Sequence, residues 1–452
     1  MNTKALRQKI LDLAIHGKLV PQDPNDEPAS VLLERIRAEK ERLIKEGKIK
    51  RSKKTKTTSD KPHYENVPFE VPSSWVWSTV NEINMYNSKN VDPAKQKENT
   101  FELYSVPIFP TNTPEIIKGE KIGSAKQSVE NGDVLLCKIN PKINRVWFVK
   151  NRTENTMIAS SEWIVIRNKF MLTDYLVFCF MSPYFRDLME NNVSGVGGSL
   201  TRAQPSMVAN YAIPIPPLQE QKRIITEIKH WFELIEVIDQ SKECLQGTIK
   251  KAKSKILDLA IHGKLVPQDP TDEPATELFK RINPKAEITS DNGHYQKLPE
   301  GWAVCQLDSI ISYEQPTPYI VKSTDYDDTY TTPVLTAGKS FIIGHTNETN
   351  GIYEKLPCII FDDFTTDSKL VDFPFKVKSS AMKILQVKEG INIEYIAMFM
   401  SITRLIGDTH KRYWISEYSK IEIPIPPQNE QDRIVKKVRL LLSRLDEIME
   451  NL

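Results

Sequence analysis

The same sixteen residues, KILDLAIHGKLVPQDP, occur twice in this chain, at residues 9–24 and again at 255–270. A second repeat has a different spacing: IPIPP ends at Pro217 and again at Pro427, and Glu, Gln, Arg and Ile follow each copy at matching positions. Long internal repeats indicate that a chain is built from copies of one structural unit. Any fold for this chain must therefore contain two similar units in one polypeptide.

The order of the repeats divides the chain into five segments. Two segments that differ from each other in sequence, residues 63–217 and 293–427, each end at IPIPP. Residues 218–292 form a central linker between them. A second linker is split between the C-terminal residues 428–452 and the N-terminal residues 1–62. Joining the two ends would give two copies of segment plus linker, which predicts a cyclic, pseudo-twofold arrangement.

The linkers carry apolar residues in alternating steps of four and three, which is the pattern of a coiled-coil seam. The intact copy predicts one helix over about 218–261, ~65 Å long at ~1.5 Å per residue. Gly17 and Gly263 stand where helix C-terminal caps are expected, and a proline follows each of them closely. The predicted seam contains Ile224, Ile228, Trp231, Ile235, Ile238, Leu245, Ile249, Ala252, Ile256 and Leu259 in the intact copy, and Ile434, Val438, Leu441, Leu445, Ile448, Leu452, Leu6, Ile10 and Leu13 in the split copy.

The two differing segments show a mixed α/β pattern. Short apolar runs predict strands, and a longer run before the turn-rich approach to IPIPP predicts a helix. The predicted fold is therefore α/β (α+β), with two globular domains separated by a long coiled coil. The predicted strands are 133–139, 144–149 and 162–168 in the first segment and 358–364 and 381–387 in the second, and the predicted helices are 173–190 and 393–403.

Composition narrows the classes of function. Basic and acidic residues nearly balance, 61 against 59, so nucleic-acid binding would have to come from local clusters of charge. The five cysteines are scattered without CxxC spacing, which argues against a zinc site and a disulfide framework and fits a reducing compartment. The charged N-terminus and the lack of a long apolar run predict a cytoplasmic protein.

The search for catalytic motifs favours a chain without chemistry of its own. LTAGKS at 335–340 ends like a phosphate-binding loop, but Pro333 stands where its first glycine would be. Asp362 or Asp363 with Asp367 and Lys369 is weakly similar to a nuclease cluster, yet these carboxylates are too close together along the chain. The sequence contains neither an NPPY-type tetrapeptide nor a glycine-rich loop for a methyltransferase cofactor. We expect no catalytic residue and no metal ligand.

Contact with DNA is better supported than catalysis. Arg202 and Arg412 both stand eleven residues before an IPIPP motif, in turn-rich stretches that otherwise differ. Arginine and glutamine side chains can contact guanine and adenine edges, whereas lysine and threonine suit phosphates. A shared arginine favours the shared task of holding phosphate, although ordinary solvated surface turns are the alternative. The candidate DNA contacts are Lys138, Lys142, Asn144, Arg145, Ser199, Thr201, Arg202 and Gln204 in the first segment, and Lys369, Thr409, Lys411, Arg412 and Trp414 in the second.

The sixteen-residue repeat keeps more than a helix seam requires. Polar residues that we expect to be exposed recur in both copies. One interpretation is a pair of identical docking surfaces for two copies of one partner. The other is a recent duplication or exchange at the DNA level, and the two are compatible. The candidate partner-binding residues are Asp12, Lys18, Gln22 and Asp23 in the first copy, and Asp258, Lys264, Gln268 and Asp269 in the second.

This layout resembles the specificity subunits of type I restriction-modification systems. The resemblance is carried by PIPPLQEQKRI at 214–224 and PIPPQNEQDRI at 424–434, and by the domain starts VPSSWVWSTV at 71–80 and LPEGWAVCQL at 298–307. GDVLLCKINPKINRVW at 132–147 and GVGGSLTRAQPSMVANYAIPIPP at 195–217 also look like the family. One departure is the basic insert KIKRSKKTK at 48–56, which has no counterpart in the second linker and no assigned role.

The resemblance implies an antiparallel coiled coil between two target-recognition domains, each reading half of an asymmetric, bipartite DNA site. It implies two methyltransferase subunits and two restriction-translocase subunits as partners. S-adenosylmethionine, ATP and Mg²⁺ would belong to those partners, because this chain would bind no cofactor. Two other classes stay open at this point: a self-contained restriction endonuclease, and a coiled-coil scaffold that does not bind DNA.

Overall fold

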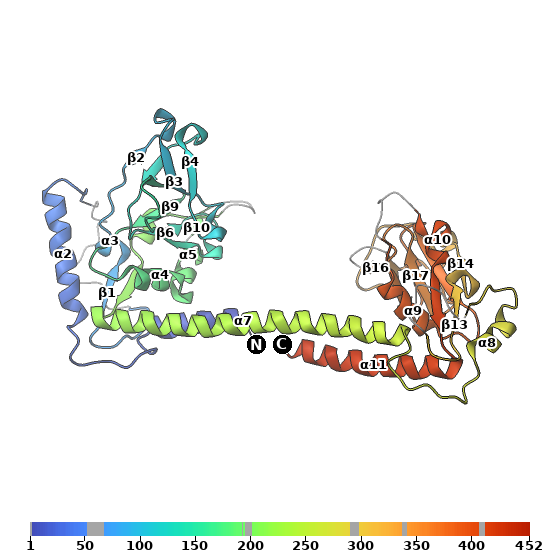
Figure 1. Ribbon diagram of the computed structural model, residues 1–452. Helices are drawn as coiled ribbons and strands as arrows, with labels where there is room; N and C mark the ends of the chain where they lie inside the picture. Colours follow the sequence, from blue (N-terminus) through green and yellow to red (C-terminus); the bar gives the residue numbers. More distant parts are fainter. Residues whose placement is uncertain are drawn as a thin grey trace. The chain divides into compact units, whose positions relative to one another are not determined.

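The computed structural model describes residues 2–51, 67–191, 193–194, 201–289, 298–336, 341–405 and 412–452. The chain divides into two compact units, Met1–Gln240 and Ser241–Leu452. Helix α7 (Leu218–Ile261) is 44 residues long and contributes its first half to unit 1 and its second half to unit 2 (Figure 1). The helix predicted over 218–261 is therefore confirmed.

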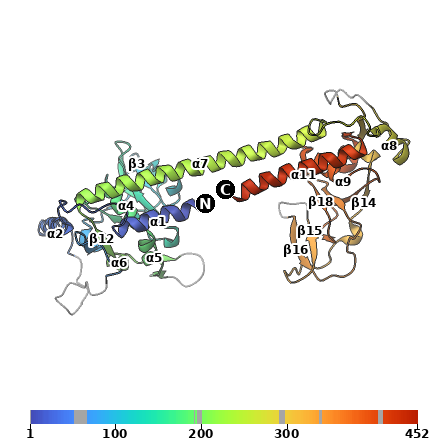
Figure 2. The ribbon, with the colours of Figure 1, turned by 90° about the horizontal axis from the view of Figure 1, so that it is seen from below.

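In unit 1, helix α1 (Thr3–Ile15) lies antiparallel to the first half of α7 (Figure 2). Arg7, near the start of α1, pairs with Asp239 at 3.1 Å, whereas Asp26, which follows α1, pairs with Arg223 near the start of α7. In unit 2, helix α11 (Gln428–Glu450) lies antiparallel to the second half of α7. Asp446 pairs there with Lys253, and the backbone oxygen of Leu452 accepts a hydrogen bond from Lys242.

The predicted seam of α7 is only partly buried. Ile224, Ile228 and Ile235 are buried in unit 1, as the seam requires, but Trp231 is 40% exposed. The reason is that α7 packs on two neighbours, since Phe232 contacts the Phe178 ring of helix α4 (Thr173–Met181) as well as Arg7 of α1. The buried face of α7 is therefore broader than the seam of a two-helix coiled coil, and its centre does not coincide with the predicted seam positions. In unit 2 Ile249 is buried and Leu245 is 38% exposed, so the seam, which the sequence predicted to be interrupted only at Lys242, is also exposed at Trp231 and Leu245.

The described residues of unit 1 form two sheets and two short strand pairs. A three-stranded antiparallel sheet has the order β7-β6-β9, and a five-stranded sheet has the order β2-β5-β8-β3-β4. Strand β1 pairs with β12, and β10 pairs with β11. The strands are β1 Val76–Thr79, β2 Asn90–Val91, β3 Thr100–Tyr104, β4 Glu115–Lys118, β5 Lys126–Ser128, β6 Val134–Cys137, β7 Val146–Phe148, β8 Thr156–Ala159, β9 Trp163–Ile166, β10 Val193–Ser194, β11 Arg202–Ala203 and β12 Ala212–Ile215.

One predicted helix of unit 1 is broken in two. The sequence predicted a single helix over 173–190, but the structure has α4 (Thr173–Met181) and α5 (Pro183–Asn191). The break follows from Pro183, because proline disfavours helical backbone in the residue before it. Ser182 accordingly has ψ 154°. Besides α1, α4, α5 and the first half of α7, the α-helices among the described residues of this unit are α2 Ala29–Lys45, α3 Val80–Ile83 and α6 Pro205–Val208.

Unit 2 has the corresponding elements with a larger central sheet. Its sheets have the orders β14-β20-β17-β18 and β16-β15-β19, and β13 pairs with β21. The predicted strands at 358–364 and 381–387 and the predicted helix at 393–403 are confirmed within a few residues. The strands are β13 Ala303–Gln306, β14 Ile311–Glu314, β15 Thr332–Leu335, β16 Ile342–Thr346, β17 Cys358–Asp362, β18 Ser368–Val371, β19 Lys376–Val377, β20 Met382–Val387 and β21 Glu422–Ile425. Besides α11 and the second half of α7, the α-helices among the described residues are α8 Ala275–Ile282, α9 Ile393–Ile402 and α10 Tyr413–Ser416.

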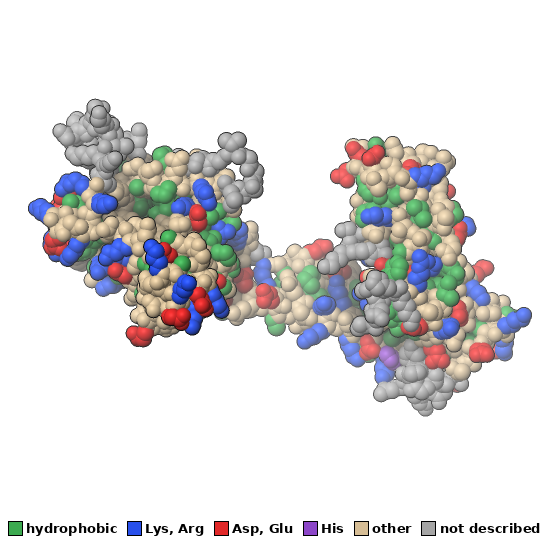
Figure 3. All heavy atoms as spheres, turned by 90° about the horizontal axis from the view of Figure 1, so that it is seen from above, with side chains coloured by type: hydrophobic (Ala, Val, Ile, Leu, Met, Phe, Trp, Pro, Cys, Tyr) green, Lys and Arg blue, Asp and Glu red, His purple; other side chains and the backbone are tan. Residues whose placement is uncertain are grey.

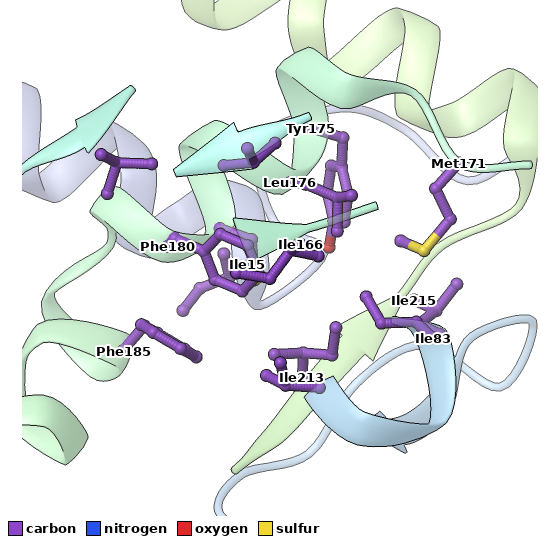
Figure 4. Packing of buried hydrophobic residues seen from close by; sticks show 14 of the residues in the cluster. Ile15, Ile83, Ile166, Met171, Tyr175, Leu176, Phe180, Phe185, Ile213 and Ile215 are labelled. Carbon is purple, nitrogen blue, oxygen red and sulfur yellow. The ribbon is translucent and has the colours of Figure 1, made fainter. Parts of the chain in front are cut away.

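The main core of unit 1 joins its helical segment to its α/β domain. Ile15 of α1 lies in one apolar cluster with Phe180 of α4 and Ile213 of β12 (Figure 4). Ile224 and Ile228 of α7 belong to the same cluster. Burial of these side chains fixes the helices to the domain. Among the described residues, every helix is too short or too polar to cross a bilayer.

Candidate DNA-recognition surfaces and helix junctions

A buried carboxylate stands at the start of α7 in unit 1. The two Glu220 carboxylate oxygens accept hydrogen bonds from Gln22 Nε2 at 2.6 Å and from Trp75 Nε1 at 2.9 Å. Burial raises the pKa of Glu220 above its ordinary value. Glu220 links the N-terminal segment, the residue that precedes strand β1 and helix α7, and we call Glu220, Gln22 and Trp75 the unit 1 junction.

Unit 2 has the same junction at the start of α11. Glu430 accepts hydrogen bonds from Gln268 Nε2 at 2.6 Å and from Trp302 Nε1 at 3.1 Å. Burial again raises the pKa of the carboxyl group. Beside it Arg433 pairs with Asp272 at 2.5 Å, and this hydrogen bond lowers the pKa of Asp272. The repeated residues therefore build the same internal contacts in each unit.

The junction also explains the repeated glycines. Gly17 and Gly263 both have φ of +65°, a left-handed conformation that glycine adopts without strain. A Cβ atom at these positions would lie 2.4 Å from Pro72 and 2.3 Å from Pro299 respectively. Each glycine thus ends its helix and lets the start of the α/β domain approach closely.

These contacts bear on the candidate partner-binding residues. The Gln22 and Gln268 amides are hydrogen-bonded within the junctions, which gives both residues a structural role. The four aspartate candidates also form hydrogen bonds with residues nearby in sequence. Lys18 and Lys264, in contrast, are exposed. Docking of a partner at these positions stays a prediction. The local partners are Lys9 for Asp12, Lys255 for Asp258, Asn25 for Asp23 and Thr271 for Asp269.

In unit 1 the two candidate DNA-contact stretches lie side by side. The backbone N–H of Asn140 donates to the Thr201 carbonyl at 2.8 Å, and that of Ala203 donates to the Lys138 carbonyl at 2.9 Å. Ile139 and Arg202 form a β-bridge between these two bonds. The loop after β6 and the stretch before IPIPP are distant in sequence but form one surface, which we call the unit 1 face.

The loop after β6 is held in one conformation by its own residues. Asn140 and Asn144 have φ of 46° and 51°, a left-handed conformation that asparagine tolerates better than most residues. Arg145 Nη1 donates to the Ile139 carbonyl at 3.2 Å and so closes the loop. Lys142 at its tip is exposed, as is Gln204 on the adjacent stretch.

A carboxylate that the sequence did not single out lies on the unit 1 face. Glu162 Oε1 is 3.1 Å from Arg202 Nη2, and Glu162 Oε2 is 3.9 Å from Lys138 Nζ. Glu162 stands in the turn between β8 and β9, far from both partners in sequence. A single glutamate before an apolar strand does not indicate from local sequence that it pairs with distant basic residues.

The backbone of unit 2 repeats this surface. In unit 1 Lys138, which follows the central strand β6, donates to the Glu162 carbonyl and accepts from the Ala203 N–H. In unit 2 Asp363, which follows the central strand β17, donates to the Ala381 carbonyl at 3.0 Å and accepts from the Tyr413 N–H at 2.9 Å.

Ala203 and Tyr413 directly follow Arg202 and Arg412. The two arginines therefore stand at equivalent positions in the backbone hydrogen-bond patterns of the two units. Whether either one contacts DNA stays a prediction.

Not every candidate in unit 2 lies on the surface. Trp414 is only 2% exposed and packs against Phe361 and Tyr418, so the prediction that its side chain contacts DNA is corrected: it is a core residue. Lys369 is exposed, with its ammonium group 4.5 Å from the centre of the Phe341 ring. Ser199, Thr409 and Lys411 lie outside the described residues, as do residues 52–56 of the basic insert.

The weak nuclease-like cluster of unit 2 has other partners. Asp367 pairs with Arg404 at 2.5 Å, and Asp362 Oδ1 accepts the backbone N–H of Phe364 at 2.8 Å. Asp363 is buried with Lys383, 3.6 Å away. Within the part of the chain that the structure describes, no group of three or more His, Cys, Asp and Glu residues is arranged to hold a metal ion.

Charge on the visible surface is mixed. Figure 3 shows Lys and Arg side chains interspersed with Asp and Glu on both units, without one dominant basic area on that face. This agrees with the formal net charge of +2. Recognition of a polyanion would therefore depend on particular side chains and their geometry.

Comparison with known proteins gives a consistent result. The family model described as the type I restriction modification DNA specificity domain matches residues 72–246 and 299–452. The specificity subunit of the type I restriction enzyme EcoAI from Escherichia coli is 29% identical over 98% of this chain and 90% of its own length. That of EcoR124I/EcoR124II, also from Escherichia coli, is 50% identical over 31% of this chain and 37% of its own length.

A solved structure has a similar fold. It comes from work on the complex assembly and conformational transition of the type I R-M system, and the TM-score is 0.58. The match covers 85% of this chain and 94% of the solved chain at 16% sequence identity. At this identity the likeness shows a shared fold.

Proposed function

The chain belongs to the family of the type I restriction modification DNA specificity domain, which it contains twice, and on that premise we propose that it selects the DNA sequence for a type I restriction-modification complex. The observation that carries this proposal is the pair of equivalent surfaces around Arg202 and Arg412. Each surface stands on its own core, at the same place in the backbone hydrogen-bond pattern, and presents different side chains.

Two surfaces that differ should read two different sequences. Side chains with hydrogen-bonding groups at fixed positions distinguish base pairs by their donor and acceptor patterns in the major groove. Because the residues around the two arginines are not the same, the proposed target is asymmetric and bipartite. Helix α7 is the covalent link between the units, and we assign it the task of fixing the unread gap.

The chemistry of the complex then belongs to other subunits. We expect two methyltransferase subunits and two restriction-translocase subunits, and we expect S-adenosylmethionine, ATP and Mg²⁺ on them. The helical linkers are the proposed docking sites, with the exposed Lys18 and Lys264 at equivalent positions in the two copies of the repeat. The relatives support this assignment because their names describe them as specificity subunits of restriction enzymes.

A domain exchange tests the proposal. Residues 63–217 are replaced by the first recognition domain of another family member, and the methylated motif is mapped in cells that supply the partner subunits. The proposal predicts that one half of the motif changes and that the other half and the gap stay the same. The reciprocal exchange of residues 293–427 is the control and should change only the other half. A methylated motif that changes in neither exchange, or that changes in both halves in each exchange, contradicts the proposal.

A further inference from the structure

The two equivalent arginines have different neighbours. The Arg202 guanidinium pairs with Glu162 at 3.1 Å, and its side chain is 53% exposed. Glu162 is 25% exposed and is itself anchored, because its backbone N–H donates to Ser160 Oγ and its carbonyl accepts from Lys138. The Arg202 guanidinium therefore pairs with the side chain of a residue whose backbone is held in place, and the rest of the Arg202 side chain is open to solvent.

Arg412 lacks this carboxylate. The backbone pattern places Ala381 where unit 1 has Glu162, and Asp363 where unit 1 has Lys138. Asp363 is turned inward, since its Oδ1 accepts the Trp414 N–H at 2.8 Å and its Oδ2 is 3.6 Å from Lys383. The Arg412 guanidinium lies 5.9 Å from the centre of the Phe364 ring, and it forms no ion pair within the described residues.

The surroundings of Arg202 and those of Arg412 suit two different kinds of contact with DNA. Holding a phosphate requires positive charge that is not already neutralised, and geometry matters little because each such contact acts through counterion release. Reading guanine requires a guanidinium held in one orientation, so that two N–H groups meet O6 and N7 together. A paired carboxylate removes part of the charge and fixes the orientation.

From this contrast we infer that Arg202 reads a guanine in the half-site of the first domain, that Glu162 is the positioning residue that orients it, and that Arg412 holds a phosphate. The inference rests on the proposed function, since it assigns tasks within the same DNA-binding surfaces. It separates two residues that sequence position alone treats as alike.

Lysine substitutions test the two assignments because lysine keeps the charge but cannot make the bidentate contact. The complete complex is assembled with Arg202→Lys or Arg412→Lys, and its dissociation constants are measured for the cognate duplex and for duplexes changed at each base pair. Arg202→Lys should reduce discrimination at one base pair of one half-site by roughly tenfold or more. Arg412→Lys should leave discrimination unchanged at every position. Arg412→Ala should lower the slope of log K against log salt by about 0.9, the value for one phosphate contact.

The role of Glu162 has its own test. Glu162→Gln should reduce discrimination at the same base pair as Arg202→Lys, and the double variant should lose little more, because both changes remove one shared contact. The matched control is Glu115→Gln, which makes the same change of charge on a side chain that lines the same surface pocket as Glu162. Discrimination in the second half-site reports that each variant is folded and assembled.

Two results would overturn the inference. In one, Glu162→Gln weakens or strengthens binding to all sequences equally, as a purely structural or repulsive role requires. In the other, Arg202→Lys keeps full discrimination while Arg202→Ala lowers the salt slope by about 0.9, which would make Arg202 a phosphate contact. Failure of the proposed function is distinguishable, because the unsubstituted complex would then show no sequence preference at all.

Discussion

Replacing Glu220 by alanine removes the acceptor of two side-chain hydrogen bonds at the unit 1 junction. Trp75 is buried, so its indole N–H would have no partner after the substitution. Gln22 is largely exposed and can turn its amide toward water at little cost. The expected loss of stability therefore comes mainly from one buried donor.

The magnitude follows from these contacts. A buried donor left without an acceptor costs about 1–3 kcal/mol. The raised pKa of Glu220 means that burial of its charge already opposes folding, so removing the carboxylate gives some of this free energy back. We expect a net loss of about 2 kcal/mol in the free energy of unfolding of unit 1. For a unit of about 150–250 residues this lowers the melting temperature by about 4–8 °C.

Differential scanning calorimetry of the full chain measures the effect. Glu220→Ala should shift the transition of unit 1, and the matched Glu430→Ala should shift that of unit 2 by a similar amount. Glu220→Gln should cost less than 1 kcal/mol, because its carbonyl oxygen can still accept from Trp75. Combining Trp75→Phe with Glu220→Ala should cost less than the sum of the two single changes, since the phenylalanine leaves no donor unpaired. Strict additivity, or an unchanged transition in Glu220→Ala, would refute the reasoning.

Three further outcomes are expected. Gly17→Ala should lower the free energy of unfolding by about 2 kcal/mol or more, because its Cβ would lie 2.4 Å from Pro72, whereas Gly47→Ala, with φ of +67° and no atom of the described residues within 4 Å, should cost only about 1 kcal/mol; equal losses in urea unfolding would contradict this. Because burial raises the pKa of Glu220 and Glu430, their stabilising effect is present below the unfolded pKa of ~4.3 and is lost as the pH rises through the folded pKa. A chain with both glutamates changed to glutamine should therefore gain stability relative to the unsubstituted chain as the pH rises from about 4 to about 7, and parallel pH profiles would speak against it. The purified chain without partners should neither cut nor methylate DNA in the presence of Mg²⁺, ATP and S-adenosylmethionine, and turnover by a partner-free preparation would instead support the endonuclease alternative.

The sequence predicted the features that depend on local pattern. The bounds of α7 and the glycines at the ends of α1 and α7 follow from spacing along one helix. The strands around β6 and β17 follow from short apolar runs. Pro183 was also visible, and giving it its usual weight would have predicted the break between α4 and α5.

Other features depend on residues that are distant in sequence. Glu220 meets Gln22 and Trp75 only in the folded chain, so the repeat revealed that these residues recur but not that they bind one another. The exposure of Trp231 depends on how α4 and α1 share the surface of α7, which periodicity cannot show.

Some of the candidate DNA contacts follow from local sequence pattern, and others depend on residues that are distant in sequence. Counting back from IPIPP placed Arg202 and Arg412 at equivalent positions, because the intervening backbone has the same length in both units. The same count predicted that Trp414 lies on the surface. Its large apolar side chain instead packs in the core beside Phe361. Glu162 was missed because its partner Arg202 lies forty residues further along the chain.

Mapping of methylated bases tests the central claim most directly. The chain is expressed with its methyltransferase partner in cells that lack other modification systems, and the genomic DNA is sequenced for modified bases. The account predicts one motif made of two different short sequences separated by a gap of fixed length and unspecified sequence. A palindromic motif, a continuous motif, or a methylation pattern that does not depend on this chain would contradict it.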